Sequence, residues 1–300
     1  MPDTLPQVIA VSAASGRLGR ATLQALALQF PERRRVAIVR TPERLADLRD
    51  VEVRRGDYAA PDSMIEALRG VQALVLVSAP ATGGTDRPAL HANAIRAACA
   101  AGVRRVIYTS VIGNGRELET GFGPTQRDNR ATEDVLAASG LEWIVARNGF
   151  YLDIDVQLMK AAAARDGVYE SAAGAGRCNY ISVAELGRAT AALAAAARPA
   201  GRCYNLVGES IDMDSLARLV AEIFGLQLRY RAVEVEAALA KSLADPRIVA
   251  RGGEPIARML TGAQHAQRLG AFDVPSDYAA AAGRPCRSIR EMLSEIARCA

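Results

Sequence analysis

The stretch Val8-Ile9-Ala10-Val11-Ser12-Ala13-Ala14-Ser15-Gly16-Arg17-Leu18-Gly19-Arg20-Ala21 decides the fold. Its four leading apolar residues predict a strand that is buried on both faces, and apolar residues at helical spacing begin at Leu18. The small residues between these two segments predict a tight turn. Because free backbone N–H groups and the helix dipole both favour an anion at a helix N-terminus, the stretch predicts a phosphate-binding turn.

Two glycines of this turn have separate expected roles. Gly16 allows a pyrophosphate to approach the backbone, and Gly19 allows the helix to pack closely on the strand. A G-x-x-G-x-x-G loop would begin with a glycine where this chain has Ala13, which tolerates a positive φ less well. The pattern fits either a nucleotide site or an ordinary strand-to-helix turn, and Ser12 and Ser15 are expected to form the turn in both cases.

Composition restricts the class of protein. Three hundred residues suffice for one large α/β domain, or for a domain with an appendage. We expect a cytoplasmic protein, because there is no apolar run of about 18 residues and no basic-then-apolar leader. Five scattered cysteines without C-x-x-C spacing predict reduced thiols and no metal site. The net charge of +4 comes from dispersed arginines, which favours solvated surface charge over a nucleic-acid-binding face.

Strands and helices alternate through the first half of the chain. This alternation predicts a parallel sheet with right-handed crossovers and a ligand at the carboxyl ends of its strands. Predicted strands cover residues 8–11, 36–39, 51–55, 73–77 and 104–109, and their carboxyl ends carry Gly16, Arg40, Asp57, Ser78 and Thr109.

The residue at the end of the second predicted strand bears on the choice of cofactor. In NAD sites an acidic residue binds the ribose hydroxyls there, but this chain has Arg40. An arginine cannot accept from a hydroxyl but can pair with a 2′-phosphate, and Arg17 and Arg44 could join it there. Arg40 therefore favours NADP over NAD, with an ordinary surface arginine as the alternative.

The second half of the chain is less regular. We divide the chain into an NAD(P)-binding domain over 1–150 and a mixed segment over 151–300, which returns partly to the sheet and forms a smaller, mostly helical substrate cap. The glycine-rich loop 113–124 is expected to be functional or mobile. Asp153 and Asp155 are two residues apart and are not expected to form a carboxylate pair. Glu133 is expected to cap or decorate a helix.

By these motifs the chain resembles the NmrA-like branch of the atypical short-chain dehydrogenase/reductases, and within it quinone oxidoreductases and triphenylmethane reductases. The resemblance implies a Rossmann-like doubly wound parallel sheet. The matching segments are A-A-S-G-R-L-G, A-I-V-R at 37–40, R-G-D-Y at 55–58, H-A-N-A-I-R-A-A at 91–98, A-G-V-R-R-V-I-Y-T-S at 101–110, A-T-E-D-V-L at 131–136, A-R-N-G-F-Y at 146–151 and C-Y-N-L-V-G at 203–208.

The resemblance also implies roles for the matched positions. The turn would hold the pyrophosphate, Arg40 would contact the 2′-phosphate, and Asn148 and Tyr151 would be the catalytic candidates. The implied cofactor-binding residues are Ser12, Ser15, Gly16, Arg17, Leu18, Gly19, Arg40, Asp57, Tyr58, Ser78, Ala79, Pro80, Thr109 and Ser110, and the implied substrate-pocket residues are Phe122, Phe150 and Tyr151.

The chain lacks the Tyr-x-x-x-Lys pair of ordinary reductases in this superfamily, because no tyrosine is followed four residues later by lysine. Two functions stay open. The protein is either a reductase of an electron-poor conjugated or aromatic molecule, for which positioning over the nicotinamide suffices, or a non-catalytic NADP-binding sensor that acts through a protein partner. We expect a monomer or homodimer with no nucleic-acid or membrane partner.

Overall fold

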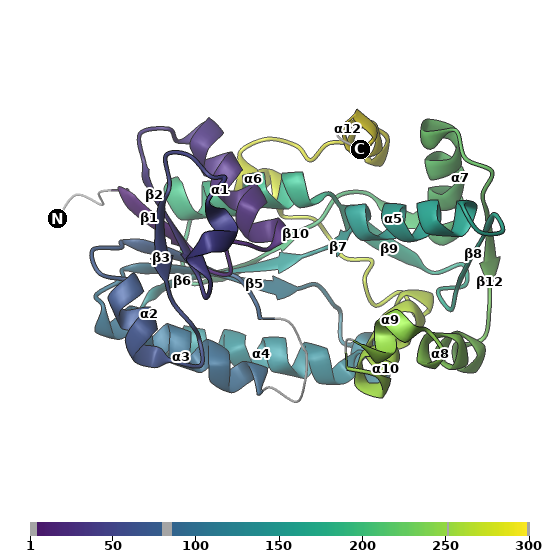
Figure 1. Ribbon diagram of the computed structural model, residues 1–300, viewed down its shortest axis with the longest axis horizontal. Helices are drawn as coiled ribbons and strands as arrows, with labels where there is room; N and C mark the ends of the chain where they lie inside the picture. Colours follow the sequence, from purple (N-terminus) through teal and green to yellow (C-terminus); the bar gives the residue numbers. More distant parts are fainter. Residues whose placement is uncertain (1–4, 80–85, 251, 299–300) are drawn as a thin grey trace.

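The computed structural model describes residues 5–79, 86–250 and 252–298. One end of the molecule holds a large sheet between two helical layers, and the other end holds two small sheets with further helices (Figure 1). Pro80, expected at the cofactor site, lies outside the described residues. Within the described ranges, no helix is long and apolar enough to cross a membrane.

The large sheet has seven strands, and each pair of neighbours is parallel. Its strand order reverses between β1 and β4, which is the switch point where α/β sheets bind ligands. In sheet order the strands are β10 (Arg202–Leu206), β6 (Glu142–Asn148), β5 (Arg105–Val111), β4 (Ala73–Leu76), β1 (Val8–Val11), β2 (Arg34–Val39) and β3 (Glu52–Arg55).

Helices cover both faces of this sheet (Figure 1), which confirms the predicted doubly wound fold. The strands are apolar on both sides, so that in β5 Val106 and Ile107 belong to separate buried clusters. One face carries α1 (Arg17–Gln29) and α6 (Val183–Ala195), and the other carries α2 (Pro61–Ala67), α3 (Arg87–Ala100) and α4 (Gly123–Ala137).

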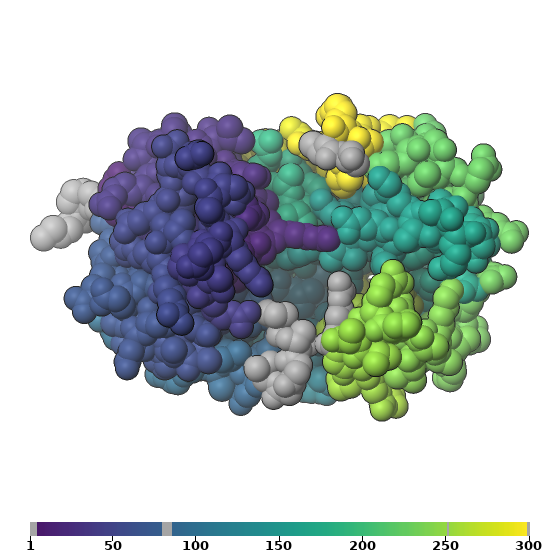
Figure 2. Space-filling model, viewed as in Figure 1, coloured from purple at the N-terminus to yellow at the C-terminus, as the bar shows by residue number. Residues whose placement is uncertain are grey.

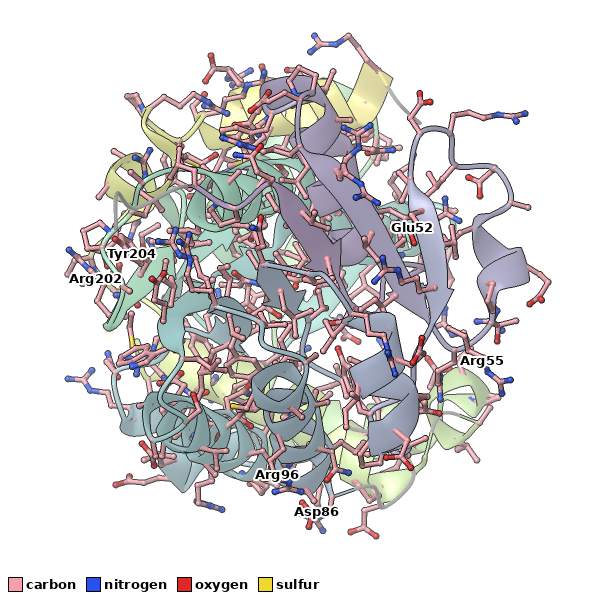
Figure 3. The ribbon with its side chains drawn as sticks, turned by 90° about the vertical axis from the view of Figure 1, so that its left-hand side faces the viewer. Glu52, Arg55, Asp86, Arg96, Arg202 and Tyr204 are labelled. Carbon is pink, nitrogen blue, oxygen red and sulfur yellow. The ribbon has the colours of Figure 1, made fainter. Side chains whose placement is uncertain are left out.

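The edges of the large sheet are polar. Figure 3 shows Glu52 and Arg55 of β3 on one side of the molecule, and Arg202 and Tyr204 of β10 on the other. The Arg202 guanidinium lies 4.5 Å from the centre of the Tyr204 ring. Because β10 comes from the second half of the chain and pairs with β6, that half contributes to the large sheet as well as to the smaller part.

The smaller part of the molecule is mostly helical. It contains two short sheets, with orders β11-β9-β7 and β12-β8. The strands are β7 (Phe150–Tyr151), β8 (Val168–Ser171), β9 (Arg177–Ile181), β11 (Ser210–Asp212) and β12 (Arg229–Ala232), and the helices are α5 (Leu152–Ala163), α7 (Met213–Phe224), α8 (Val235–Leu243), α9 (Pro246–Val249), α10 (Glu254–Arg268) and α12 (Ile289–Arg298). Helix α11 (Tyr278–Ala282) packs instead against α6 and β10 of the larger part.

The glycine-rich loop 113–124 is anchored to the smaller part of the molecule. Within it lies a short 3-10 helix, η2 (Arg116–Glu119). The buried Glu117 carboxylate accepts from Gln126 Nε2 at 2.8 Å and from Gly115 N at 2.9 Å. A Cβ on Gly262 of α10 would lie 2.3 Å from Phe122 N, so the loop and that helix meet backbone to backbone. The loop therefore serves as a packed joint.

Candidate functional site

The turn after β1 is held by hydrogen bonds that the sequence does not reveal. The Ser12 side chain is fully buried, and its Oγ donates to Val75 O at 3.0 Å and accepts from Val77 N at 3.1 Å. Ser12 Oγ also lies 2.5 Å from the Tyr58 hydroxyl. These bonds hold the turn against β4 and the residue that follows it. Ser12 therefore stabilises the conformation of the turn from a buried position.

Ala13 adopts the left-handed conformation expected of the glycine it replaces, with φ of 47°. The turn closes through Gly16 N, which donates to Ala13 O at 2.9 Å. The predicted role of Gly19 needs correction, because a Cβ there would lie 2.7 Å from Ala14 Cα and 2.8 Å from Ala13 O. Gly19 therefore packs against the turn rather than against the strand.

Replacing Ala13 with glycine is expected to stabilise the protein. The left-handed conformation costs an L-residue about 1–2 kcal/mol, whereas glycine loses about 0.5–1 kcal/mol of chain entropy, so the free energy of unfolding should rise by about 0.5–1 kcal/mol. Urea denaturation measures this change. The matched variant Ala27→Gly, inside α1, should lower the free energy of unfolding by about the same amount. Destabilisation by Ala13→Gly would contradict the strain at this position.

The N-terminus of α1 is open to an anion. Its N-cap is Gly16, which supplies no side-chain hydrogen bond, and its first turn contains no acidic residue. Arg17 in this turn reaches across to the smaller part of the molecule, where its Nη2 donates to Gln157 Oε1 of α5 at 2.9 Å. The backbone N–H groups of the first turn can therefore bind a pyrophosphate, and Arg17 ties this end of the site to α5.

A cavity of about 270 Å³ opens beside this turn. Five of the predicted cofactor-binding residues line it, and so does Arg44. The five are Ser15, Arg40, Asp57, Tyr58 and Ala79. Arg40 and Arg44 are exposed, and their side chains have no ion pair with the residues that the structure describes. The lining residues are Ala13, Ser15, Val39, Arg40, Thr41, Arg44, Gly56, Asp57, Tyr58, Ala79 and Leu90.

Two arginines in the wall of this cavity and the open helix N-terminus beside it suit an adenosine phosphate joined to a pyrophosphate. Asp57 and Tyr58, the residues predicted to border the adenine, line the same cavity. The Tyr58 hydroxyl points inward and donates to Val77 O at 2.8 Å. Burial raises its pKa, so the phenol stays protonated.

Polar side chains of β5 and α3 hold the backbone that follows β4. Ser78 N donates to Thr109 Oγ1 at 3.0 Å, and Ala79 N donates to His91 Nε2 at 2.9 Å. Burial lowers the pKa of His91 to about 3, so its ring is neutral and accepts this bond. The Ser78 hydroxyl itself accepts from Arg87 Nη2 at 2.7 Å. His91 therefore has a structural role, in which it supports the backbone at Ala79.

Ser110 belongs to a buried ionic cluster. Its Oγ donates to Glu133 Oε1 at 2.6 Å, and Glu133 also accepts from Arg147 Nη2 at 2.5 Å and from Arg130 Nη1. Glu133 is nearly inaccessible to solvent, so the expectation that it caps or decorates a helix is wrong. The reason is tertiary, because two neighbouring strands bring Ser110 and Arg147 onto the same face of α4.

The catalytic candidates lie where β6 passes into the smaller part of the molecule. Asn148 is buried in β6, and its Oδ1 has no hydrogen-bond partner among the described residues. Burial raises the pKa of Tyr151, and a hydrogen bond with the Asn148 side chain partly lowers it. Asn148 is therefore a buried neighbour of the Tyr151 phenol, and Tyr151 itself lines a cavity.

Three phenylalanines form a cluster beside these residues. The Phe150 ring lies 4.5 Å from Phe272 and 6.2 Å from Phe122 between centroids. Phe122, predicted to line the substrate pocket, has only 7% of its surface exposed and packs behind Phe150. Phe272 was not identified from the sequence, because nothing in its neighbourhood distinguishes it from an ordinary core residue.

A second cavity, of about 420 Å³, lies in the smaller part of the molecule between α5, β8, α8, α9 and α10. Figure 2 shows α5 in teal and α10 in yellow-green, facing the purple and blue N-terminal part of the chain. Its wall includes aromatic, aliphatic and charged side chains, among them Phe150, Tyr151, Ile154, Asp155, Leu158, Tyr169, Glu170, Tyr180, Lys241, Asp245 and Arg247.

The doubly wound sheet, with a cavity beside the turn that follows β1, is typical of nucleotide-binding proteins. This chain belongs to the NAD(P)H-binding family, whose model matches residues 13–195. It is an NAD(P)H-dependent oxidoreductase of the NmrA-like, atypical short-chain dehydrogenase/reductase type. Quinone oxidoreductase 2 of Escherichia coli (strain K12) is 30% identical over 295 residues, which cover 96% of this chain and 98% of that relative.

Solved structures agree with this assignment. The NADPH-dependent quinone oxidoreductase of Escherichia coli, complexed with NADPH, matches with a TM-score of 0.82 and 29% identity, covering 96% of this chain and 99% of that one. The triphenylmethane reductase of Citrobacter sp. matches with a TM-score of 0.83 and 28% identity, covering 97% of this chain and 99% of that one. The resemblance inferred from the motifs is thereby confirmed.

Proposed function

We propose that this protein reduces a conjugated, electron-poor small molecule, such as a quinone or a related aromatic acceptor, with NADPH in preference to NADH. The observation that carries the proposal is the pair of cavities. One is bordered by Arg40 and Arg44, and the other is walled by aromatic and aliphatic side chains around Tyr151. The names of the relatives, a quinone oxidoreductase and a triphenylmethane reductase, support an acceptor of this class.

In this proposal the segments have distinct tasks. The turn from Ser12 to Gly19 binds the pyrophosphate, and Arg40 with Arg44 binds the 2′-phosphate. Bound NADPH supplies the hydride. Asn148 and Tyr151 orient the reacting groups, and Phe150 supplies a flat apolar wall for an aromatic ring. Residues 1–150 would then form the cofactor domain. Residues 151–300 would form the substrate cap and would also contribute α6 and β10 to the large sheet and its helical layer.

Replacing Tyr151 with alanine tests the position of the acceptor. We expect turnover of a quinone to fall about tenfold, because the acceptor loses an orienting wall, whereas the Kd for NADPH should change less than about threefold. Stopped-flow absorbance of the reduced cofactor gives the turnover, and nicotinamide fluorescence gives the Kd. Wild-type turnover in this variant would place the acceptor elsewhere.

The whole proposal is tested by titrating the wild-type protein with NADPH and then adding a quinone or a triphenylmethane dye. Binding followed by oxidation of the cofactor supports the reductase. Binding without oxidation by either class of acceptor would contradict it, and would favour the alternative of an NADP-binding sensor that acts through a partner.

A further inference from the structure

Three carboxylates lie in the wall of the larger cavity, and two of them are neutralised by cations. Glu170 accepts from Lys241 Nζ at 2.5 Å and pairs with Arg231. Asp245 accepts from Arg247 Nη2 at 2.7 Å. The third carboxylate, Asp155, has a different environment.

Asp155 is bonded to hydroxyl groups. The Tyr169 hydroxyl donates to Asp155 Oδ1 at 2.9 Å, and the Tyr180 hydroxyl is a second hydrogen-bond partner. In the described part of the chain no cation pairs with this carboxyl group. The two tyrosines come from β8 and β9, so the cluster joins both small sheets to α5. An acid in this setting can be neutral or charged at little difference in free energy.

Asp155 lies in the wall of the cavity in which the acceptor is proposed to bind. Asp155 and Leu158 are three residues apart on one face of α5, Tyr151 is the N-cap of this helix, and all three line the cavity. The neighbouring Asp153 has another task, because its Oδ2 accepts from Val183 N at 2.8 Å. Of the two carboxylates in this helix, Asp155 is the one that faces the cavity.

The charge state of Asp155 is controlled by its surroundings. Burial raises its pKa to about 6, and the hydrogen bonds from Tyr169 and Tyr180 hold it below the value that burial alone would give. The ionisable groups around it are Tyr169 of β8, Cys178 and Tyr180 of β9, Arg165 beyond the end of α5, and, across the cavity, Glu170 of β8, Lys241 of α8, and Asp245 and Arg247 at α9.

We propose that Asp155 is the proton donor of the reduction, in place of the tyrosine of the absent Tyr-x-x-x-Lys pair; this inference rests on the proposed reductase function. Addition of one hydride to a quinone leaves an oxyanion, and one proton completes the hydroquinone. An O–H bond forms at that oxygen while the O–H bond of the Asp155 carboxyl group breaks. The resulting carboxylate is stabilised by the two tyrosine hydroxyls and regains its proton from water.

The pH dependence of quinone reduction tests this donor. Only the protonated carboxyl can donate, so wild-type kcat should fall as the pH rises through about 6. Asp155→Asn should lower kcat at pH 5.5 about tenfold and should remove the fall of kcat with rising pH. The expected loss is smaller than is usual for a general acid, because water can also protonate a hydroquinone anion. Tyr169→Phe removes a hydrogen bond that lowers the pKa, so the fall should move to higher pH.

Tyr230→Phe is the matched control. Tyr230 packs near Tyr169, with 6.5 Å between ring centroids, but its hydroxyl donates to Ser171 O and Gly174 O rather than to Asp155. This variant should keep the wild-type pH profile. A shift as large as that of Tyr169→Phe would mean that repacking of the small sheets, and not the bond to Asp155, moves the profile, and would overturn the proposal.

A second readout needs no turnover. In protein labelled with ¹³C at the aspartate carboxyl carbons, the signal that disappears in Asp155→Asn should titrate near pH 6. Titration in the ordinary range of aspartate, near 4, would overturn the donor role. If the wild-type protein reduces quinones and the Asp155→Asn variant keeps its rate and its pH profile, the donor role is also overturned. A wild-type protein that binds NADPH but reduces no acceptor would instead overturn the proposed function, and the donor role with it.

Discussion

Replacing Arg40 with glutamate is expected to weaken NADPH binding by about 100-fold or more and to leave NADH binding within about threefold of wild type. The loss of two charge-assisted hydrogen bonds to a 2′-phosphate removes about 3 kcal/mol, and each 1.4 kcal/mol is a factor of ten in Kd. The new carboxylate adds repulsion of the phosphate. In NADH the same carboxylate can accept from a ribose hydroxyl, which offsets the loss of the arginine.

The measurement is the Kd of each cofactor by nicotinamide fluorescence at one ionic strength, since exposed charges are screened by salt. Arg49→Glu is the matched control, because Arg49 is an exposed arginine of the same region that does not line the cavity. It should change both Kd values by less than about threefold, as expected for a distant surface charge. Equal losses for NADPH and NADH in Arg40→Glu would remove Arg40 from the 2′-phosphate site.

Replacing Gly19 with alanine is expected to weaken NADPH binding by about 100-fold and to lower the free energy of unfolding by about 2 kcal/mol. The added Cβ would lie 2.7 Å from Ala14 Cα and 2.8 Å from Ala13 O, and both are backbone atoms that cannot rotate away. Overpacking of this kind costs about 1–3 kcal/mol. The turn must shift, and loss of two hydrogen bonds from its N–H groups to the pyrophosphate accounts for the rest.

Two glycine variants separate these effects. Gly70 has φ of 71° and no atom within 4 Å of an added Cβ, so Gly70→Ala should cost about 1 kcal/mol of stability and leave NADPH binding unchanged. Gly16→Ala adds a Cβ 3.2 Å from Ala13 O, a milder contact, so the variant should stay within about 1 kcal/mol of wild-type stability. A Gly19→Ala variant that binds NADPH like the wild type would show that the turn is not the pyrophosphate site.

Much of the fold could be predicted because its signals are local. The apolar run before Ser12, the glycines after it and the alternation of strands with helices lie within segments of a few residues each, and the structure has the parallel sheet that they predict. The resemblance to the family further supported this fold, because the matching segments follow one another along the chain in the expected order. Helix α7 has a local signal of the same kind, because its buried residues recur at helical spacing, at Met213, Leu216, Ala217 and Val220.

The candidate site divides along the same line. Arg40 and Asp57 could be placed at the carboxyl ends of their strands from the sequence, and both line the smaller cavity. The roles of Ser12 and Glu133 could not, because their partners lie on strands and helices far along the chain. Phe122 was expected to line the substrate pocket, but of the three clustered phenylalanines only Phe150 lines the larger cavity, whereas Phe122 and Phe272 are buried behind it.

By itself the sequence determined the class of fold, the tight turn after the first strand, the cation at the end of the second strand and the absence of the Tyr-x-x-x-Lys pair, because each of these depends on residue types at short spacing. The tertiary structure alone decided that Ala13 carries a positive φ, that the loop 113–124 is packed, and that the half-buried Asp155 is hydrogen-bonded to Tyr169 and Tyr180. Burial and hydrogen bonding between distant segments set backbone strain and the pKa of a carboxyl group, and neither can be read from neighbours along the chain.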